Sequence, residues 1–251
     1  LKHGLVNNSP LVVGGIGGMR AMILAAGLGT RLKPWTDKHP KALALVNGKS
    51  LLQRNIEYLQ QFGIHELIIN VHHFAEQISE ALEKNNGWGS NITISDETNE
   101  VLETGGGLQK AKWFFAEEEN LVLLNSDVLT DMPLNEMIAF HKERQALATL
   151  ATTNRETSRY FLFDDDNFLC GWRNVKTGEE KLVKQANVYH QKAFSGIHVI
   201  NTKIFPLMQY SGKFSIVDAY ISLCASQKIL SFNHLRNLYF DKAFSPKRRT
   251  C

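Results

Sequence analysis

The stretch AAGLGTRLKPWTDKHPK, residues 25–41, begins at the end of the apolar run AMILAA and decides the fold class. A continuous apolar run of this kind is typical of a parallel strand that is buried on both faces. Gly27 and Gly29 follow the run, and glycines there let backbone N–H groups approach an anion closely. Ligands of open α/β sheets bind beyond the carboxyl ends of the strands. The stretch therefore predicts a strand followed by an anion-binding loop.

Strands and helices alternate along the rest of the chain. The apolar patterns predict further strands at 65–71, 91–95, 121–125, 146–152, 161–163 and 195–200. They predict helices around 52–59, 74–82, 108–115, 134–144 and 216–224. Ser50 and Gln53 have the spacing of a capping box at the start of the first helix. This order predicts an α/β, Rossmann-like fold with a mostly parallel central sheet and helices on both faces.

Composition limits the class of function. The 251 residues carry a formal net charge of +3, which is too weak to argue for the basic face that nucleic-acid binding requires. No run approaches the roughly 18 apolar residues of a membrane span. The three cysteines form no CxxC pair, which favours a reducing, cytoplasmic location. We therefore expect no nucleic acid and no membrane as partners, and the sequence leaves the oligomeric state open.

Two common phosphate-binding templates do not fit the glycine loop. A P-loop requires GxxxxGK[ST], which Gly27 and Gly29 do not provide. The dinucleotide fingerprint GxGxxG would need a third glycine where Leu32 stands. What remains is GxGTR with a downstream Pro-Lys pair, so the loop brings Arg31 and Lys41 to the edge of the sheet.

The longer string LAAGLGTRLKPWTDKHPKAL resembles the signature of the sugar-1-phosphate nucleotidylyltransferases. The resemblance extends through SLLQRNIEYLQQFGIHELIINVHHFAEQI, ETGGGLQKA, LVLLNSDV and FSGIHVI. It implies a GT-A-type fold and transfer of a nucleotidyl group from an NTP to a sugar 1-phosphate, giving an NDP-sugar and pyrophosphate. The LETGGG element resembles bacterial N-acetylmuramate-1-phosphate uridylyltransferases and, equally, mannose- or heptose-1-phosphate guanylyltransferases. The base and the sugar therefore stay open.

The chemistry of such a reaction requires positive charge rather than a strong general base. A sugar phosphate has a second pKa near ~6 and is mostly dianionic at neutral pH. Two anionic reactants must meet, and charge grows on the departing pyrophosphate. Arg31 can grip the β- and γ-phosphates with a bidentate fork, and Lys41 can place its charge near the α-phosphate or the incoming sugar phosphate. We expect Arg31 and Lys41 to be catalytic and Mg²⁺ to bridge phosphate oxygens.

Candidate nucleotide and metal contacts lie at the ends of predicted strands. Asp127 in LNSDV follows a buried strand and is the expected Mg²⁺ ligand, the alternative being an aspartate that only shapes a turn. In ETGGG, the resemblance places Thr104, Gly105 and Gly106 against the nucleobase, the alternative being a plain loop before a helix. Asn70 is a weaker nucleotide contact. The expected nucleotide-binding residues of the first loop are Ala25, Ala26, Gly27, Leu28, Gly29, Thr30 and Arg31.

The sugar-phosphate side and the chain ends carry weaker signals. The resemblance indicates Arg173, Ser195 and Gly196 near the sugar phosphate, and Asp241 as a second metal ligand. Lys242 and the residues after it depart from the usual continuation, which predicts an atypical or truncated C-terminus and reduced activity. Residues 1–18 are polar and then rich in glycine, so we expect a flexible extension there and a single domain over 19–251.

Two other functions are compatible with the pattern. A phosphocholine cytidylyltransferase would share the fold and signature, and its choline site would need an aromatic cage, to which Trp172 and Tyr160 could contribute. A non-catalytic nucleotide-binding paralogue is favoured by the departure near Asp241. The presence of Arg31, Lys41 and Asp127 argues against that second alternative.

Overall fold

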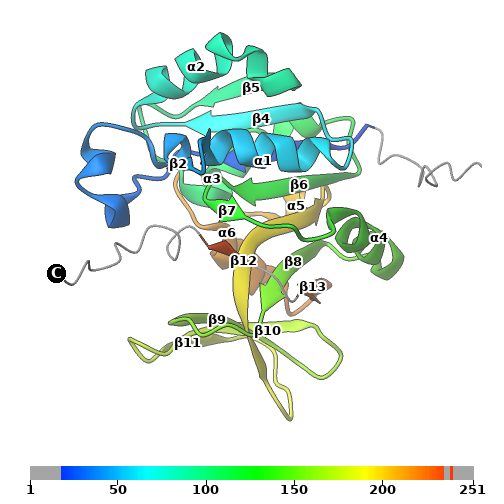
Figure 1. Cartoon of the computed structure of the whole chain (residues 1–251). Coiled ribbons are helices and arrows are strands. Elements are labelled where there is room, and N and C mark those ends of the chain that lie inside the picture. Colours follow the sequence, from blue (N-terminus) through cyan, green and yellow to red (C-terminus); the bar gives the residue numbers. More distant parts are fainter. Residues whose placement is uncertain (1–17, 235–237, 240–251) are drawn as a thin grey trace, which may run out of the picture.

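A computed structural model describes residues 18–234 and 238–239, without the side chains of Arg31, Leu238 and Tyr239. Its centre is a parallel sheet with the strand order β5-β4-β1-β6 (Figure 1). These strands are β1 (Arg20–Leu24), β4 (Glu66–Val71), β5 (Asn91–Asp96) and β6 (Asn120–Asn125). The predicted α/β class with parallel central strands is confirmed.

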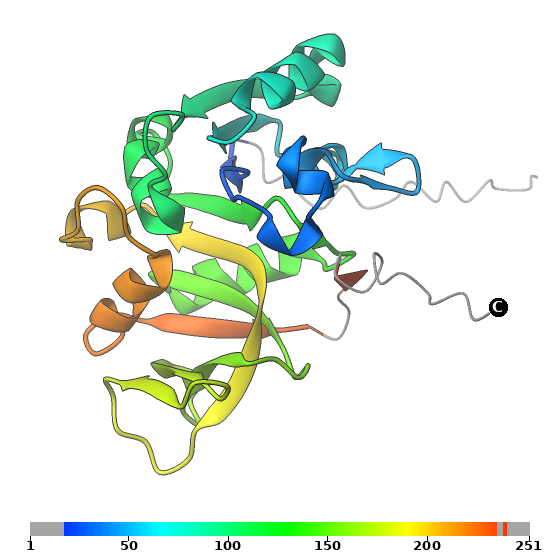
Figure 2. The same ribbon diagram turned by 90° about the vertical axis from the view of Figure 1, so that its left-hand side faces the viewer.

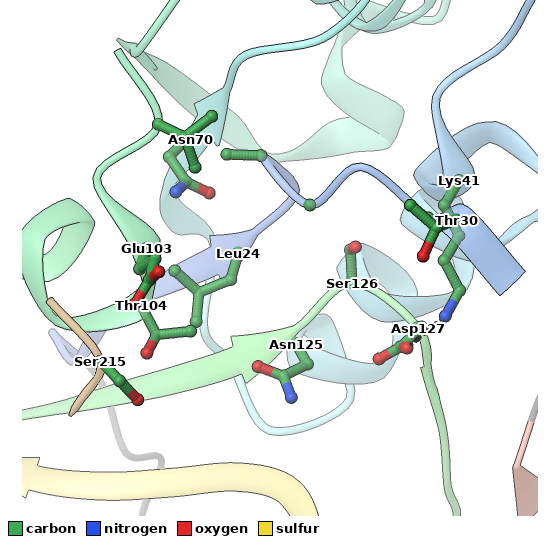
Figure 3. Close-up of a pocket in the computed structure, with 14 residues that line it drawn as sticks. Leu24, Thr30, Lys41, Asn70, Glu103, Thr104, Asn125, Ser126, Asp127 and Ser215 are labelled. Atoms are coloured by element: carbon green, nitrogen blue, oxygen red, sulfur yellow. Dashed lines mark hydrogen bonds and ion pairs between the residues drawn. The ribbon is translucent and has the colours of Figure 1, made fainter. Parts of the chain in front are cut away.

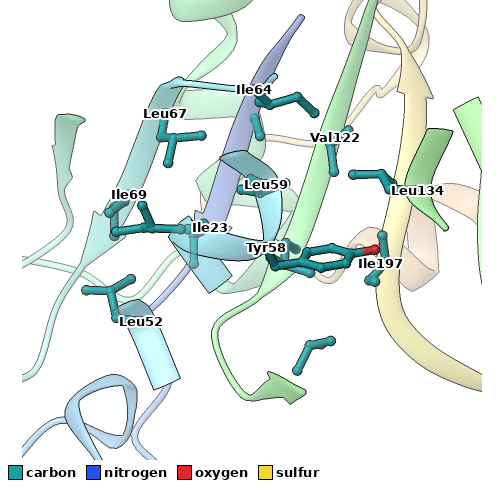
Figure 4. Close-up of a cluster of buried hydrophobic side chains, with 14 of the residues drawn as sticks. Ile23, Leu52, Tyr58, Leu59, Ile64, Leu67, Ile69, Val122, Leu134 and Ile197 are labelled. Carbon is teal, nitrogen blue, oxygen red and sulfur yellow. The ribbon is translucent and has the colours of Figure 1, made fainter. Parts of the chain in front are cut away.

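Helices cover both faces of this sheet, as the alternating pattern predicts. They are α1 (Leu51–Gln60), α2 (Ala75–Lys84), α3 (Glu103–Lys110), α4 (Leu134–Arg144), α5 (Ile204–Leu207) and α6 (Ile216–Leu223). The side chains of α1, α2 and α4 pack in one buried cluster with Ile23 of β1, as Figure 4 shows for α1. Those of α3, α5 and α6 pack in a second cluster with Met22. Strand β1 is therefore buried on both faces, which explains its continuous apolar run.

The capping signal before the first helix is also present in the structure. Ser50 is the N-cap of α1, and its hydroxyl accepts a hydrogen bond from the backbone N–H of Gln53 at 3.1 Å. The bond satisfies one of the helix's unpaired N–H groups and fixes where α1 begins.

A second half of the sheet is antiparallel except for the parallel pair β8–β13, and it is centred on one long strand, β12 (His190–Asn201). Strand β12 pairs antiparallel with β6 and β8 at one end and with β9 at the other, and it bends visibly between them (Figure 2). Further strands are β8 (Ala148–Thr153), β9 (Arg159–Phe163), β10 (Leu169–Asn174), β11 (Glu179–Leu182) and β13 (Ile229–Asn233). Predicted strands near 161–163 and 195–200 are therefore present, and the latter is longer than predicted.

The remaining elements are short. They are the strands β2 (Leu45–Val46), β3 (Lys49–Ser50), β7 (Val128–Leu129) and β14 (Leu238–Tyr239) and the 3₁₀ helices η1 (Thr30–Leu32), η2 (Trp35–Asp37), η3 (Lys41–Leu43), η4 (Asn86–Gly89) and η5 (Lys112–Phe115). Within the described ranges, no helix has the length and apolar character needed to cross a membrane. The predicted extension falls almost wholly on residues 1–17, which lie outside the described part of the chain.

Candidate active site

A cleft of about 440 Å³ opens at the carboxyl ends of β1, β4 and β6. This is where an open α/β sheet is expected to bind ligands. Figure 3 shows two groups of side chains that face each other across the cleft, with Lys41 and Asp127 at one end and Thr104 and Ser215 at the other. The lining residues are Leu24, Ala26, Gly27, Gly29, Thr30, Lys41, Asn70, Val101, Glu103, Thr104, Asn125, Ser126, Asp127 and Ser215.

The glycine loop forms one wall of this cleft. Gly29 adopts the left-handed conformation with φ 60° and is the N-cap of η1. A Cβ atom at Gly29 would lie 2.9 Å from Cβ of Lys41, so a larger residue would be both strained and crowded. Gly27 is exposed, and a Cβ atom there would meet nothing within 4 Å. The loop therefore turns tightly at Gly29 and presents open backbone at Gly27.

An ion pair at one end of the cleft joins two predicted functional residues. Nζ of Lys41 lies 2.5 Å from Oδ2 of Asp127, and the two side chains point toward each other in Figure 3. Pro40 is buried and extended, with φ −71° and ψ 139°, and it delivers Lys41 to the start of η3. The Lys41 side chain is 13% exposed and that of Asp127 is 37% exposed. The sequence assigned these residues separate roles, whereas the structure holds them in contact.

Comparison with known proteins places the chain in a family. A family model described as nucleotidyl transferase matches residues 20–210. This chain belongs to the nucleotidyl transferase family. It is 30% identical to a mannose-1-phosphate guanyltransferase from Yarrowia lipolytica over 86% of this chain and 58% of the relative. It is 43% identical to an N-acetylmuramate alpha-1-phosphate uridylyltransferase from Neisseria meningitidis over 45% of this chain and 49% of the relative.

These relatives are longer than the matched region. The chain spans 58%, 50% and 50% of three such relatives, two of them mannose-1-phosphate guanyltransferases and one a UTP–glucose-1-phosphate uridylyltransferase. Among solved structures, HddC from Yersinia pseudotuberculosis complexed with GMP-PN superposes with a TM-score of 0.70 at 22% identity. That match covers 90% of this chain and 95% of the other chain, and it supports a GT-A-type fold for this chain.

The structure brings part of the predicted loop into the cleft. Ala26, Gly27, Gly29 and Thr30 line it. Leu28 is 51% exposed and is absent from the lining. Ala25 is buried, and its backbone N–H donates to the side-chain oxygen of Asn70 at 2.8 Å. Arg31 lies in η1, but its side chain falls outside the described part of the structure. Its role therefore stays a prediction.

The second glycine cluster lies inside a helix rather than in a loop before one. Residues 103–110 form helix α3, not a loop, and Gly105 and Gly106 are buried. Their backbone N–H groups donate to the carbonyl of Phe214 at 2.9 and 3.2 Å. A Cβ atom would collide with the Phe214 ring at Gly105 and with the Gly212 carbonyl at Gly106. In the described structure Gly105 and Gly106 are packing positions whose N–H groups bond to Phe214, and their contact with a nucleobase stays a prediction.

Thr104 differs from the glycines that follow it. It lines the cleft beside Glu103. Its hydroxyl accepts a hydrogen bond from the backbone N–H of Ile216 at 2.9 Å, which ties the start of α3 to the start of α6. Ser215, the N-cap of α6, lines the same end of the cleft (Figure 3). Thr104 therefore lies where a ligand could contact it, whereas Gly105 and Gly106 are absent from the cleft lining.

The structure does not bring the predicted sugar-phosphate residues to the cleft lining. Arg173 lies on β10 and forms an ion pair with Glu180 of β11, at the far end of the antiparallel half (Figure 1). Ser195 is 1% exposed, and its hydroxyl is 2.9 Å from Nε2 of His234. A Cβ atom at Gly196, where φ is 84°, would lie 2.5 Å from Val128. These residues are committed to internal contacts in the described structure.

Several lining residues were missed by the sequence reading. Asn125 and Ser126 directly precede Asp127 at the end of β6, and that position was the signal that could have found them. Glu103 stands next to Thr104 but has a positive φ of 60°, which the sequence did not indicate. Val101 and Ser215 carried no local signal, because Ser215 reaches the cleft only through the packing of α6 against α3.

The described lining of the cleft contains no histidine, and its carboxylates are those of Glu103 and Asp127. His198 lies elsewhere, on β12, where burial lowers its pKa to about 3. Burial likewise lowers the pKa of His141 in α4 to about 4. Both imidazoles are therefore neutral at pH 7 and hydrogen-bonded in the interior.

Proposed function

We propose that this chain transfers a nucleotidyl group from an NTP to a sugar 1-phosphate in the cleft beside the glycine loop. The observation that carries the proposal is the Lys41–Asp127 pair, 2.5 Å apart, in a glycine-lined cleft at the carboxyl edge of the sheet. Membership of the nucleotidyl transferase family supports the same class of reaction. The arrangement offers a cation and a carboxylate at the place where phosphates would enter.

The proposed step is an in-line displacement at the α-phosphorus. A phosphate oxygen of the sugar 1-phosphate forms the new bond to the α-phosphorus. The bond from the α-phosphorus to the α–β bridging oxygen of the NTP breaks, and the electron pair leaves with pyrophosphate. Open backbone at Gly27 would accommodate the nucleotide phosphates. Lys41 would leave Asp127 and turn its charge toward the reacting phosphates. Arg31 would bind the departing pyrophosphate, a role that rests on the sequence alone.

The residues at the cleft fit Mg²⁺. Mg²⁺ is usually held by one or two carboxylates together with water and substrate phosphate oxygens. Asp127 supplies one carboxylate, and Asn125 and Ser126 supply neutral oxygens beside it. The described residues hold no cluster of three His, Cys, Asp or Glu side chains that could bind a metal by themselves. When bound, the ion would neutralise charge on the phosphates. Asp241, the proposed second ligand, lies outside the described residues.

The proposed role of Asp127 as a Mg²⁺ ligand can be tested by nucleotide binding, without an assay of turnover. We expect Asp127→Asn to remove the dependence of nucleotide affinity on Mg²⁺ concentration, while nucleotide binding without Mg²⁺ persists. Isothermal titration with and without Mg²⁺ measures this difference. An unchanged Mg²⁺ dependence in the variant would place the metal on other residues.

The proposed activity is tested by pyrophosphate release. The chain should be assayed with GTP, UTP, CTP, ATP and dTTP, each paired with mannose, glucose and N-acetylmuramate 1-phosphates. We expect release only when an NTP and a sugar 1-phosphate are present together, with one base strongly preferred. Tight NTP binding without release under any pairing would instead favour the non-catalytic paralogue.

The phosphocholine alternative finds no support in the antiparallel half. Trp172 pairs with Phe161 in the β9–β10 register, and Tyr160 pairs with the next residue, Arg173. Successive residues of a strand point to opposite faces, so Trp172 and Tyr160 do not converge on one cage. Lys181 also places its own ammonium 5.7 Å from the centroid of the Trp172 ring.

A further inference from the structure

We propose that Glu97 is a positioning residue that holds the glycine loop in place through Asn70. The proposal rests on the proposed function, because the loop matters for affinity only if it receives nucleotide phosphates. Glu97 follows β5 and does not line the cleft, so it acts through its neighbours rather than on a ligand.

A buried chain of hydrogen bonds links Glu97 to the start of the loop. Glu97 and Asn70 are each 2% exposed. The side-chain nitrogen of Asn70 donates to Oε1 of Glu97 at 2.9 Å. The side-chain oxygen of Asn70 accepts from the backbone N–H of Ala25 at 2.8 Å. The carboxylate is therefore two hydrogen bonds away from the backbone that opens the glycine loop.

The position of Asn70 explains why this chain of bonds matters. Leu24 and Asn70 form the last register pair between β1 and β4. Beyond Leu24 the main-chain ladder ends, and the Asn70 side chain supplies the next bond to Ala25 in its place. On the other side of β1, the backbone N–H of Ser126 donates to the Leu24 carbonyl at 3.1 Å. The loop therefore leaves the sheet with a fixed direction.

Glu97 also determines which way the Asn70 amide faces. An ionised carboxylate is only an acceptor, so it requires the NH₂ group of Asn70 to face it. The amide oxygen is then turned toward Ala25. A rotated amide would set NH₂ against the N–H of Ala25 and leave buried polar groups unpaired, which is costly. The carboxylate thus selects the one orientation that supports the loop.

The same carboxylate holds the opposite wall of the cleft. Oε2 of Glu97 accepts from the backbone N–H of Leu102 at 3.3 Å, one residue before α3. A Cβ atom at Gly107 would lie 2.8 Å from Oε1 of Glu97 and 3.0 Å from the Asn70 side-chain nitrogen, so α3 sits directly on this pair. Glu97 therefore sets the glycine loop and the N-terminus of α3 relative to each other.

A charge-conserving exchange tests the proposal. In Glu97→Gln, only one of the two bonds accepted by the carboxylate can be kept. In Asn70→Asp, two carboxylates face each other in a buried site. The double variant Asn70→Asp/Glu97→Gln restores complementarity: the new carboxylate accepts from Ala25 and from the new amide, whose oxygen accepts from Leu102. Both single variants should be impaired, and the double variant should recover.

Two measurements follow the loop directly. The first is the Kd of UTP or GTP, whichever binds the wild-type chain more tightly, determined by titration calorimetry well below the unfolding temperature. The second is hydrogen exchange of a peptide spanning residues 22–30, which reports the N–H of Ala25. We expect each single variant to bind nucleotide about tenfold more weakly and to exchange faster there. The double variant should return to within about threefold of wild type in Kd and to wild-type exchange.

Tyr220→Phe is a matched control for loss of a buried hydrogen bond. The Tyr220 hydroxyl is 2.9 Å from Nδ1 of His198, in the interior and away from the cleft lining. This variant should be less stable than wild type with an unchanged nucleotide Kd. If Glu97 had a purely structural role, its variants would also be less stable than wild type with an unchanged nucleotide Kd.

The outcomes are separable. Wild-type Kd in both single variants, or a double variant as weak as the weaker single variant, would overturn the proposal. If a single variant does not fold, a folded double variant with wild-type Kd supports the exchange, and an unfolded double variant contradicts it. A wild-type chain that binds no NTP would refute the proposed function, whereas exchange at residues 22–30 would still test whether Glu97 holds the loop.

Discussion

The two glycine clusters of this chain look alike in sequence and differ in the structure. Gly27 is open, with no atom within 4 Å of a Cβ placed there, and Gly29 forms the tight turn beside Lys41. Gly105 and Gly106 lie inside α3, where a Cβ atom would collide with the segment that leads into α6. The first cluster leaves space for a ligand. The second removes side chains so that two elements can approach.

This difference shows how one residue type serves two purposes at one cleft. A glycine can expose backbone to a phosphate, or it can let a helix pack closely on its neighbour. The second cluster matters for function only indirectly, because it seats α3, whose first residues Glu103 and Thr104 line the cleft. Substitutions that add one methyl group therefore distinguish the two clusters.

The largest expected effect is at Lys41, which lies beside Gly29 of the first glycine cluster. Lys41→Met should lower kcat/KM by roughly 10²-fold or more, because it removes a charge proposed to act on the reacting phosphates. Steady-state pyrophosphate release measures this. Lys49→Met is the matched control, since Lys49 forms an exposed ion pair with Glu57 at 2.7 Å and lies outside the cleft lining. Equal activity of the two variants would remove Lys41 from the mechanism.

Substitutions in the second glycine cluster, at Gly105 and Gly106, should lower the free energy of unfolding the most. Gly106→Ala should lower the free energy of unfolding by about 3 kcal/mol, because the added methyl group collides with the Gly212 backbone. Alanine's higher helix propensity, worth about 1 kcal/mol, would act in the opposite direction and is smaller. Urea unfolding gives the value. A variant more stable than wild type would mean that α3 does not pack this closely.

A substitution at Gly29 should lower both the stability of the chain and its affinity for nucleotide, each by a smaller amount. Gly29→Ala forces a side chain into the left-handed region and toward Cβ of Lys41. A loss of about 1–2 kcal/mol in unfolding free energy is expected, together with weaker nucleotide binding. Thermal unfolding and nucleotide titration on the same preparation measure the two parts. Loss of stability alone, with wild-type affinity, would make the turn a purely structural feature.

The smallest effect on folding is expected at Gly27. Gly27→Ala should change the free energy of unfolding by no more than about 0.5 kcal/mol, since the site is open and its φ is not positive. Nucleotide affinity should nevertheless fall, because the methyl group would stand where phosphate is proposed to bind. An affinity equal to that of wild type would place the phosphates away from this part of the loop.

The sequence predicted the part of the fold that depends on local patterns. Buried parallel strands such as β1 and β6 read as continuous apolar runs, and Ser50 marks the start of α1 by its own hydrogen bond. The antiparallel half was less predictable. Strand β12 pairs with β6, β8 and β9, and no local pattern states which distant strands will meet.

The site was predictable to a similar degree. Lys41 and Asp127 are 86 residues apart, yet each was expected at the same edge because each follows a strand of the parallel sheet. Their direct contact was not predicted, since it depends on side-chain geometry. Glu97 was missed because a polar residue after a strand reads as an ordinary loop. The pairing of Gly105 with Phe214 was missed because it spans more than a hundred residues.

Selective ¹⁵N-glycine labelling compares the two clusters in one experiment. The chain contains 18 glycines, and Gly→Ala variants assign the signals that matter. During titration with the NTP that supports pyrophosphate release, we expect the largest amide shift changes at Gly27 and Gly29, with smaller ones at Gly105 and Gly106. Larger amide shift changes at Gly105 and Gly106, with unchanged shifts at Gly27 and Gly29, would contradict the assignment of phosphate binding to the glycine loop.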